Sequence, residues 1–281
     1  MTASVIARIL DDPDALADLL GKDETAVGRE IYRRFHLGIA PGGTGSDDDR
    51  VLLDGVRRRL AGRRRPSSGW AYRSALAGGR LVVRRDDGLE VAVAFGDIER
   101  AEGEQVTLRL PSLEPGVMNG WVWFHGRTRG RDKLTARIYL CLPTAERAKW
   151  WSDLVAGLDD QAHVFSAKII RRREERVRPD GAVIYCRTPD VPDTLSVVRK
   201  LVPPGQLGSP TAGFAAPVCA GISVGVPQDG EDPHASLGME RAMSIARLLG
   251  SDPPTESDLS AVAELLERQR SQVTGLLKEC A

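Results

Sequence analysis

The sequence is poor in the residues that build metal centres and disulfide frameworks. Its 281 residues include four cysteines and four histidines, and no two cysteines have the C-x-x-C spacing of a zinc site. The cysteines lie scattered at positions 141, 186, 219 and 280. We therefore expect free thiols in a reducing compartment, not disulfides.

The chain also lacks an excess of charge, because 39 basic residues balance 39 acidic ones. This balance excludes the global positive field of proteins that bind nucleic acid or anionic membranes non-specifically. Lysine is scarce, since it accounts for six of the 39 basic residues and arginine for the rest. Arginine does not lose its proton at working pH, so a lysine within a predicted strand is chemically distinctive.

Long apolar runs are missing as well. The N-terminal stretch MTASVIARILDDPDALADLL is interrupted by acidic residues and by Pro13, so it predicts neither a signal peptide nor a membrane-spanning helix. At 42% hydrophobic residues, the chain can bury one large core or two modest ones. We expect a compact cytoplasmic protein.

The hydrophobic pattern changes along the chain. Residues 1–38 and 51–60 have helical patterns, and residues 70–110 alternate as strands with a hairpin signal at Asp87-Gly88. After residue 119 strands alternate with helices. One predicted helix has Trp151, Leu154, Val155 and Leu158 on a single apolar face. Thr255 and Asp258 form a capping pair for a last amphipathic helix, whose residues toward the core include Leu259, Val262, Leu266 and Val273. We predict an α+β fold with a mixed, largely antiparallel sheet flanked by helices. Residues 1–118 would form an N-terminal helical and β-hairpin region, and residues 119–281 the core.

Two predicted strands carry unusual polar faces. In TARIYLCL, residues 135–142, the strand period of two puts Arg137, Tyr139 and Cys141 on one face. In HVFSAKII the same period puts Lys168 on a partly apolar face with Ser166. The alternative for both strands is a face that meets only solvent.

A third distinctive segment is EDPHASLGMERAMSIARLL. Ser236 can cap a helix whose free N–H groups, together with Arg241 one turn later, would make an anion-binding corner. The alternative is an ordinary capped helix with an exposed arginine.

Taken in order, these segments resemble the HopA class of type III effector proteins. An Arg-x-Tyr strand, a lysine strand, the strand DGAVIYC and a Ser-x-Gly-x-x-Arg helix start follow one another as in that family, over roughly residues 119–250. YRRFHLG, residues 32–38, is a weaker N-terminal match. The effector phosphothreonine lyases are distantly similar, although their corresponding strand begins Lys-x-His where this chain has Arg137-x-Tyr139.

The resemblance implies a HopA-like fold and a lyase reaction. Members encoded in class V lanthipeptide and thioviridamide-like (thioamitide) clusters eliminate phosphate from a precursor peptide that a kinase-like protein has phosphorylated on Ser or Thr. The products are dehydroalanine and dehydrobutyrine. The implied partners are therefore a phosphorylated precursor peptide and a kinase-like phosphotransferase, without nucleic acid or membrane.

Phosphate elimination needs a base for the Cα proton, donors for the developing enolate and cations for the phosphate, but no cofactor. Arginine suits the phosphate, so we expect Arg137 and Arg241 to bind it with Ser236, followed by Arg178 and Arg176. The base must be neutral part of the time, which excludes arginine and indicates Lys168. Tyr139 or His36 could then donate a proton, although His36 is equally explained as a histidine packed after a helix.

Two other functions remain open from the sequence. The same arginines would serve a non-catalytic module that binds a phosphopeptide or supports the kinase-like partner. An effector that acts on host signalling is the third possibility. A precursor leader segment could bind along a free sheet edge within residues 70–110.

Overall fold

The computed structural model describes residues 22–38, 49–116, 120–128, 133–143, 146–171, 178–228, 231, 236–249 and 256–278. The chain forms helices and two sheets, with all strand pairings in the described residues antiparallel. The predicted α+β fold is confirmed. Among the described residues, no helix is both long and apolar enough to cross a bilayer.

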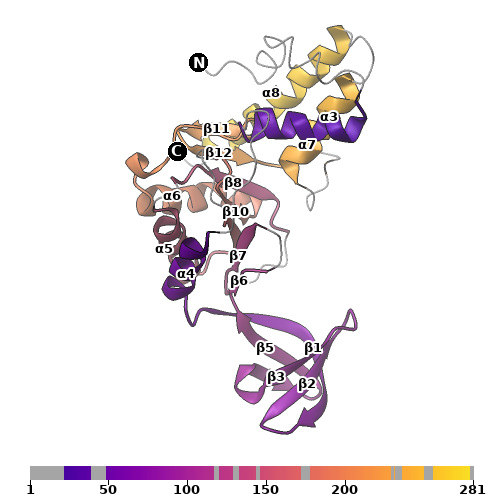
Figure 1. Ribbon diagram of the computed structural model, residues 1–281, viewed down its shortest axis with the longest axis vertical. Helices are drawn as coiled ribbons and strands as arrows, with labels where there is room; N and C mark the ends of the chain where they lie inside the picture. The colour runs from indigo at the N-terminus through magenta and orange to yellow at the C-terminus, as the bar shows by residue number, and fades with distance from the viewer. Residues whose placement is uncertain are drawn as a thin grey trace.

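The first sheet has five strands in the order β3-β2-β1-β5-β4 and projects from one end of the molecule (Figure 1). Its strands are β1 (Arg64–Leu76), β2 (Arg80–Arg85), β3 (Glu90–Ala94), β4 (Ile98–Glu102) and β5 (Gln105–Pro111), with a 3₁₀ turn, η2 (Phe95–Asp97), before β4. The hairpin predicted at Asp87-Gly88 joins β2 to β3. A separate small core forms inside this sheet, from Trp70, Val83, Val93, Val106 and Leu108.

The second sheet has seven strands in the order β11-β12-β8-β10-β9-β7-β6. They are β6 (Leu113–Glu114), β7 (Trp121–His125), β8 (Ala136–Leu140), β9 (Phe165–Ile170), β10 (Ala182–Cys186), β11 (Ala216–Cys219) and β12 (Ile222–Gly225). All five residues of β8 are buried. The alternative in which its polar face meets only solvent is therefore wrong, because helices and loops cover both faces of this strand.

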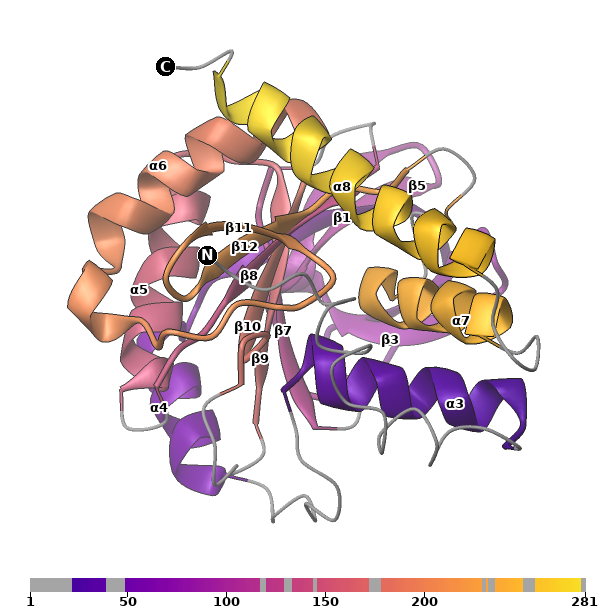
Figure 2. The ribbon, with the colours of Figure 1, turned by 90° about the horizontal axis from the view of Figure 1, so that it is seen from above.

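One face of this sheet packs against α4 (Arg50–Arg59), α5 (Arg147–Asp160) and α6 (Val191–Leu201), as Figure 2 shows. The predicted apolar face of α5 is confirmed, since Trp151, Leu154, Val155 and Leu158 have no exposed surface. Short 3₁₀ turns, η3 (Thr188–Asp190) and η4 (Pro204–Gln206), flank α6.

The helices α3 (Glu24–Ile31), α7 (Leu237–Leu249) and α8 (Glu256–Lys278) lie at the other side and top of the sheet (Figure 2). Helix α3 continues as a π-helical turn, η1 (Tyr32–His36). It packs closely on α7, because a Cβ on Gly28 would lie 2.2 Å from the sulfur of Met243. In α8 Val273 is buried as predicted, whereas the side chains of the predicted core residues Leu259, Val262 and Leu266 lie outside the described part.

Contacts cross the expected division at residue 118, which stays a prediction. Helix α3 packs on α7, α4 packs on α5, and β6 belongs to the seven-stranded sheet. Only residues 64–111 form a sheet of their own among the described residues before position 118.

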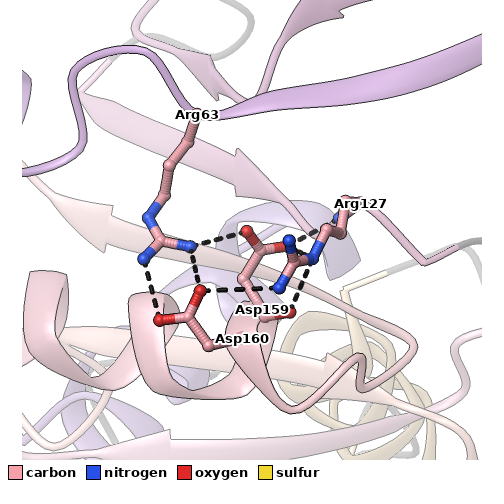
Figure 3. Close-up of polar contacts among 4 residues, drawn as sticks. All are labelled: Arg63, Arg127, Asp159 and Asp160. Carbon is pink, nitrogen blue, oxygen red and sulfur yellow. Dashed lines mark hydrogen bonds and ion pairs between the residues drawn. The ribbon is translucent and has the colours of Figure 1, made fainter.

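Arginines and aspartates connect the base of the small sheet to the second sheet and its helices (Figure 3). Arg63, which precedes β1, donates to Asp159 at 2.8 Å and to Asp160 at 2.9 Å, both at the end of α5. The backbone N–H of Arg127, after β7, donates to the other oxygen of Asp159 at 2.7 Å. One buried carboxylate thus joins three segments of the chain.

Candidate active site

Strand register brings the distinctive residues of three predicted strands onto one face of the seven-stranded sheet. Tyr185 of β10 lies opposite Arg137 of β8 on one side and Ser166 of β9 on the other. In the same way Val183 lies between Tyr139 and Lys168. This face is opposite to the one that packs on α4, α5 and α6, and α3 and α7 approach it.

Lys168 is at the centre of an aromatic cluster on this face. Its Nζ atom lies 4.2 Å from the ring centre of Trp121, 5.4 Å from that of Trp123 and 5.7 Å from that of Tyr185. Trp123 and Tyr185 stack on each other with ring centres 5.3 Å apart. In the described part of the chain no carboxylate lies within ion-pair distance of Lys168, so the rings stabilise its charge by cation–π attraction.

Arg137 and Arg178 add positive charge to the same face. The guanidinium carbon of Arg137 lies 5.6 Å from the Tyr185 ring centre, and that of Arg178 lies 5.9 Å from the Trp121 ring centre. Arg137 is 3% exposed and donates to the Thr135 carbonyl at 3.4 Å. Both guanidiniums thus lie near rings that also surround Lys168, and Arg137 is buried.

Arg178 is held by a buried carboxylate. Its Nε and Nη2 donate to the two oxygens of Asp180 at 2.8 and 2.9 Å. Burial acts to raise the pKa of Asp180, but the charge and hydrogen bonds of Arg178 hold that pKa below its usual range. Asp180 therefore stays ionised and fixes the orientation of Arg178.

The predicted anion-binding corner at the start of α7 is occupied by the protein itself. Arg241 is 1% exposed and donates to Glu231 and to the carbonyl oxygens of Phe214 and Val226 at 2.7–2.9 Å. It ties the loops before β11 and after β12 to α7. Arg241 is therefore neither the exposed arginine of the alternative interpretation nor open to a ligand in this arrangement.

The other predicted site residues are placed as follows. Ser236 is exposed, directly precedes α7, and lies near the side chain of Tyr32. Arg176 lies outside the described residues.

Tyr139 and His36 contact each other on the same side of the sheet as Lys168, Arg137 and Arg178. Their rings contact edge to face with centres 5.4 Å apart, and His36 also stacks on Tyr32 and Phe214. Burial raises the pKa of Tyr139 well above its usual range and lowers the pKa of His36 to about 4. Both side chains are therefore neutral near pH 7. The Nδ1 atom of His36 accepts a hydrogen bond from the Phe214 backbone at 3.3 Å.

The structure adds residues that the sequence interpretation did not select. Trp121, Trp123 and Tyr185 surround Lys168, and Asp180 orients Arg178. The alternation in WVWFH, residues 121–125, was the available signal, because it puts both tryptophans on one strand face. Their proximity to Lys168 depends on the pairing of β7 with β9, in which Trp123 lies opposite Lys168.

Cys141, the third residue of the polar face predicted from TARIYLCL, directly follows β8. Burial raises the pKa of Cys141 to about 11, so this thiol on the β8 polar face stays protonated. Within the described segments, no group of three or more His, Cys, Asp or Glu residues could hold a metal ion.

Comparisons with known proteins relate this arrangement to a family. The sequence profile of the HopA1 effector protein family matches residues 114–273. The effector protein from Pseudomonas syringae pv. tomato strain DC3000 is similar in structure, with a TM-score of 0.51, 12% identity, and 93% of this chain and 95% of that one covered. For the effector protein from Pseudomonas syringae pv. syringae strain 61 the values are 0.49, 14%, 89% and 92%. No curated protein matches the chain. At 12% identity, the likeness to the protein of strain DC3000 shows a common fold.

Proposed function

The chain belongs to the HopA1 effector protein family, and from this membership we propose that it is a phosphoserine or phosphothreonine lyase. It would eliminate phosphate from a phosphorylated precursor peptide and leave dehydroalanine or dehydrobutyrine, in thioamitide or lanthipeptide biosynthesis. The observation that carries the proposal is the amine of Lys168, held by three aromatic rings beside two arginines.

The reaction begins with removal of the Cα proton. Lys168 is suited to this step because an amine can give up and accept a proton, whereas the neighbouring guanidiniums cannot. The rings of Trp121, Trp123 and Tyr185 hold its Nζ atom, and among the described residues no carboxylate forms an ion pair with it. The proton passes from Cα to Nζ as the Cα=Cβ bond forms.

The charge around Lys168 favours a phosphorylated ligand. Arg137 and Arg178 bring two fixed positive charges to this part of the face, and Lys168 adds a third whenever it is protonated. Among the described residues near them Asp180 brings one negative charge. A phosphoryl group carries between one and two negative charges at neutral pH. In addition, the buried indole N–H of Trp123 has no hydrogen-bond partner among the described residues, and an acceptor oxygen would satisfy it.

Two substitutions of Lys168 test the proposal. Lys168→Ala removes the amine, whereas Lys168→Arg keeps the positive charge but cannot act as a base. With a peptide carrying one phosphoserine or phosphothreonine, both should lower the rate of phosphoric acid loss by about 10²–10⁴-fold. Mass spectrometry measures the product, and Lys168→Arg should still bind the phosphopeptide.

Lys149→Arg is the matched control, because Lys149 lies over a tryptophan elsewhere, with Nζ 3.6 Å from the Trp150 ring centre on α5. Its turnover should equal that of the wild type. Wild-type turnover in both Lys168 variants would contradict the assignment of the base. Tight phosphopeptide binding without any mass change in the wild type would instead favour a binding module that supports the kinase-like partner.

We further propose that the kinase-like phosphotransferase associates with this protein, so that the phosphorylated peptide passes directly from one enzyme to the other. The edge strands β3 and β4 of the small sheet offer backbone hydrogen-bonding groups to a leader peptide or to this partner. Co-purification of the two proteins, with and without the precursor peptide, tests the association.

A further inference from the structure

A second chain of interacting polar groups lies on the Lys168 face. His125 of β7 contacts Ser166 of β9, with 2.9 Å between Nδ1 and Oγ, and its Nε2 lies 3.4 Å from a carboxylate oxygen of Glu114 on β6. Strand pairing sets these contacts, because His125 lies opposite Ser166 and Glu114 lies opposite Trp123. Carboxylate, imidazole and hydroxyl thus form a continuous path toward Lys168.

The carboxylate end of this path is charged and anchored. The pKa of Glu114 is lowered to about 2, because hydrogen bonding with His125 and the charge of Arg65 both favour the carboxylate. Burial acts in the opposite direction but is outweighed. Arg65, at the start of β1, forms an ion pair with the other carboxylate oxygen. The ring of His125 also stacks on Trp123, with centres 5.9 Å apart. Glu114 therefore stays ionised and orients the imidazole.

This path is more accessible than the proton donors that the sequence indicated. The side chain of His125 is 28% exposed, whereas His36 is 2% exposed and Tyr139 is 5% exposed. His36 is also stacked between Tyr32 and Phe214. A ligand on the Lys168 face could reach Ser166, but it could reach Tyr139 and His36 only if neighbouring rings moved.

We propose that Ser166 donates the proton to the departing phosphate and that His125, held by Glu114, resupplies it. This inference rests on the proposed function. A phosphomonoester at neutral pH carries up to two negative charges, so departure without a proton would release a trianion. As the Cβ–O bond breaks, its electron pair goes to the phosphate oxygen, which takes the Ser166 proton. The Nδ1 proton of His125 restores the hydroxyl, and Lys168 and His125 then exchange protons with water.

The spacing of acid and base suits a β-elimination. Ser166 and Lys168 are two residues apart on the same face of β9, which separates their Cα atoms by about 7 Å. A substrate side chain between them can present its Cα–H to one group and its phosphate oxygen to the other. Ser166 is therefore the catalytic residue of this path, and His125 and Glu114 are positioning residues that act through it.

Leaving-group dependence tests the proposal. Two peptides of one sequence are compared, one with phosphoserine and one with β-chloroalanine, because chloride departs without a proton. Ser166→Ala should slow phosphate elimination by about 10²-fold or more and change chloride elimination only a few-fold. Ser166→Thr, which keeps a hydroxyl, should restore phosphate elimination. His125→Gln and Glu114→Gln should also slow phosphate elimination more than chloride elimination, but with smaller losses of rate than Ser166→Ala.

Each contrary result has a distinct meaning. The assignment of the proton donor would be overturned if Ser166→Ala lost the same fraction of its rate on both peptides. It would also be overturned by equal rates of the Ala and Thr variants on the phosphopeptide, or by a phosphoryl group trapped on Ser166. Lys168→Ala should lose both reactions. If the wild type and Ser166→Ala eliminate phosphate equally fast, only this inference is refuted. If the wild type does not eliminate phosphate, the proposed function is refuted as well.

Discussion

Gly238 lies directly against the ring of His36. A Cβ atom at position 238 would be 2.6 Å from Nε2 of His36 and 2.7 Å from its Cδ2. The two residues come from opposite ends of the chain, from the π-helical turn after α3 and from the first turn of α7. This close approach lets α7 pack over the buried imidazole and brings Ser236 to Tyr32.

The first prediction follows from this contact. Gly238→Ala should lower the free energy of unfolding by about 1–2 kcal/mol, because overpacking of a buried site outweighs the better helix propensity of alanine. Gly275→Ala in α8 is the control, since among the described residues no atom beyond its own stretch of helix lies within 4 Å of the added Cβ. It should be neutral or stabilise by up to about 1 kcal/mol. Urea denaturation measures both, and equal effects would contradict the packing argument.

His36 should make stability depend on pH. Burial, opposed by Asp180 and supported by nearby cations, lowers its pKa from 6.5 to about 4. In the unfolded chain His36 binds a proton below about pH 6.5, whereas in the folded protein it binds one only below about pH 4. The stability of the folded protein therefore falls as pH falls from about 6.5 to about 4. Between pH 7 and pH 5 the loss should be about 2 kcal/mol.

The variant His36→Gln checks this assignment, because glutamine does not titrate. It should be less stable than the wild type at pH 7, since the ring stacking is lost. Between pH 7 and pH 5, however, its free energy of unfolding should decrease by about 2 kcal/mol less than that of the wild type. Denaturant midpoints at the two pH values give the comparison. A parallel decline of both proteins would show that other groups cause the pH dependence.

Arg241 should matter for stability far more than a surface arginine of the same helix. Arg241→Met leaves Glu231 and two carbonyl groups without their shared donor, and should cost about 3–5 kcal/mol. Arg247 on α7 pairs with Glu24 in an exposed contact, so Arg247→Met should cost at most about 1 kcal/mol. Thermal unfolding compares the two, and similar melting temperatures would refute the structural role of Arg241.

The small sheet should depend on Asp159 for its attachment (Figure 3). The Asp159 side chain is 3% exposed and accepts from Arg63 and from the Arg127 backbone, so Asp159→Ala should cost about 3 kcal/mol. Asp160 is 60% exposed, and Asp160→Ala should cost at most about 1 kcal/mol. Hydrogen exchange in β1 and β5 should rise in the first variant and not in the second.

The strand faces could be predicted from the sequence because strand geometry is local. Alternation by itself put Arg137 with Tyr139 and Lys168 with Ser166, and the structure keeps both pairs on one face. The apolar face of α5 followed from helical periodicity in the same way. Both rules need only the chain direction and the repeat of the element.

The surroundings of those residues could not be predicted, because they depend on contacts between distant segments. Periodicity does not reveal that β7 pairs with β9 and so surrounds Lys168 with tryptophans, nor that Glu231 binds Arg241 inside the protein. Sequence alone therefore determined which chemical groups share a strand face. Tertiary structure decided which of them are buried, charged, held by partners or accessible, because burial and electrostatic environment arise from packing between elements far apart in the chain.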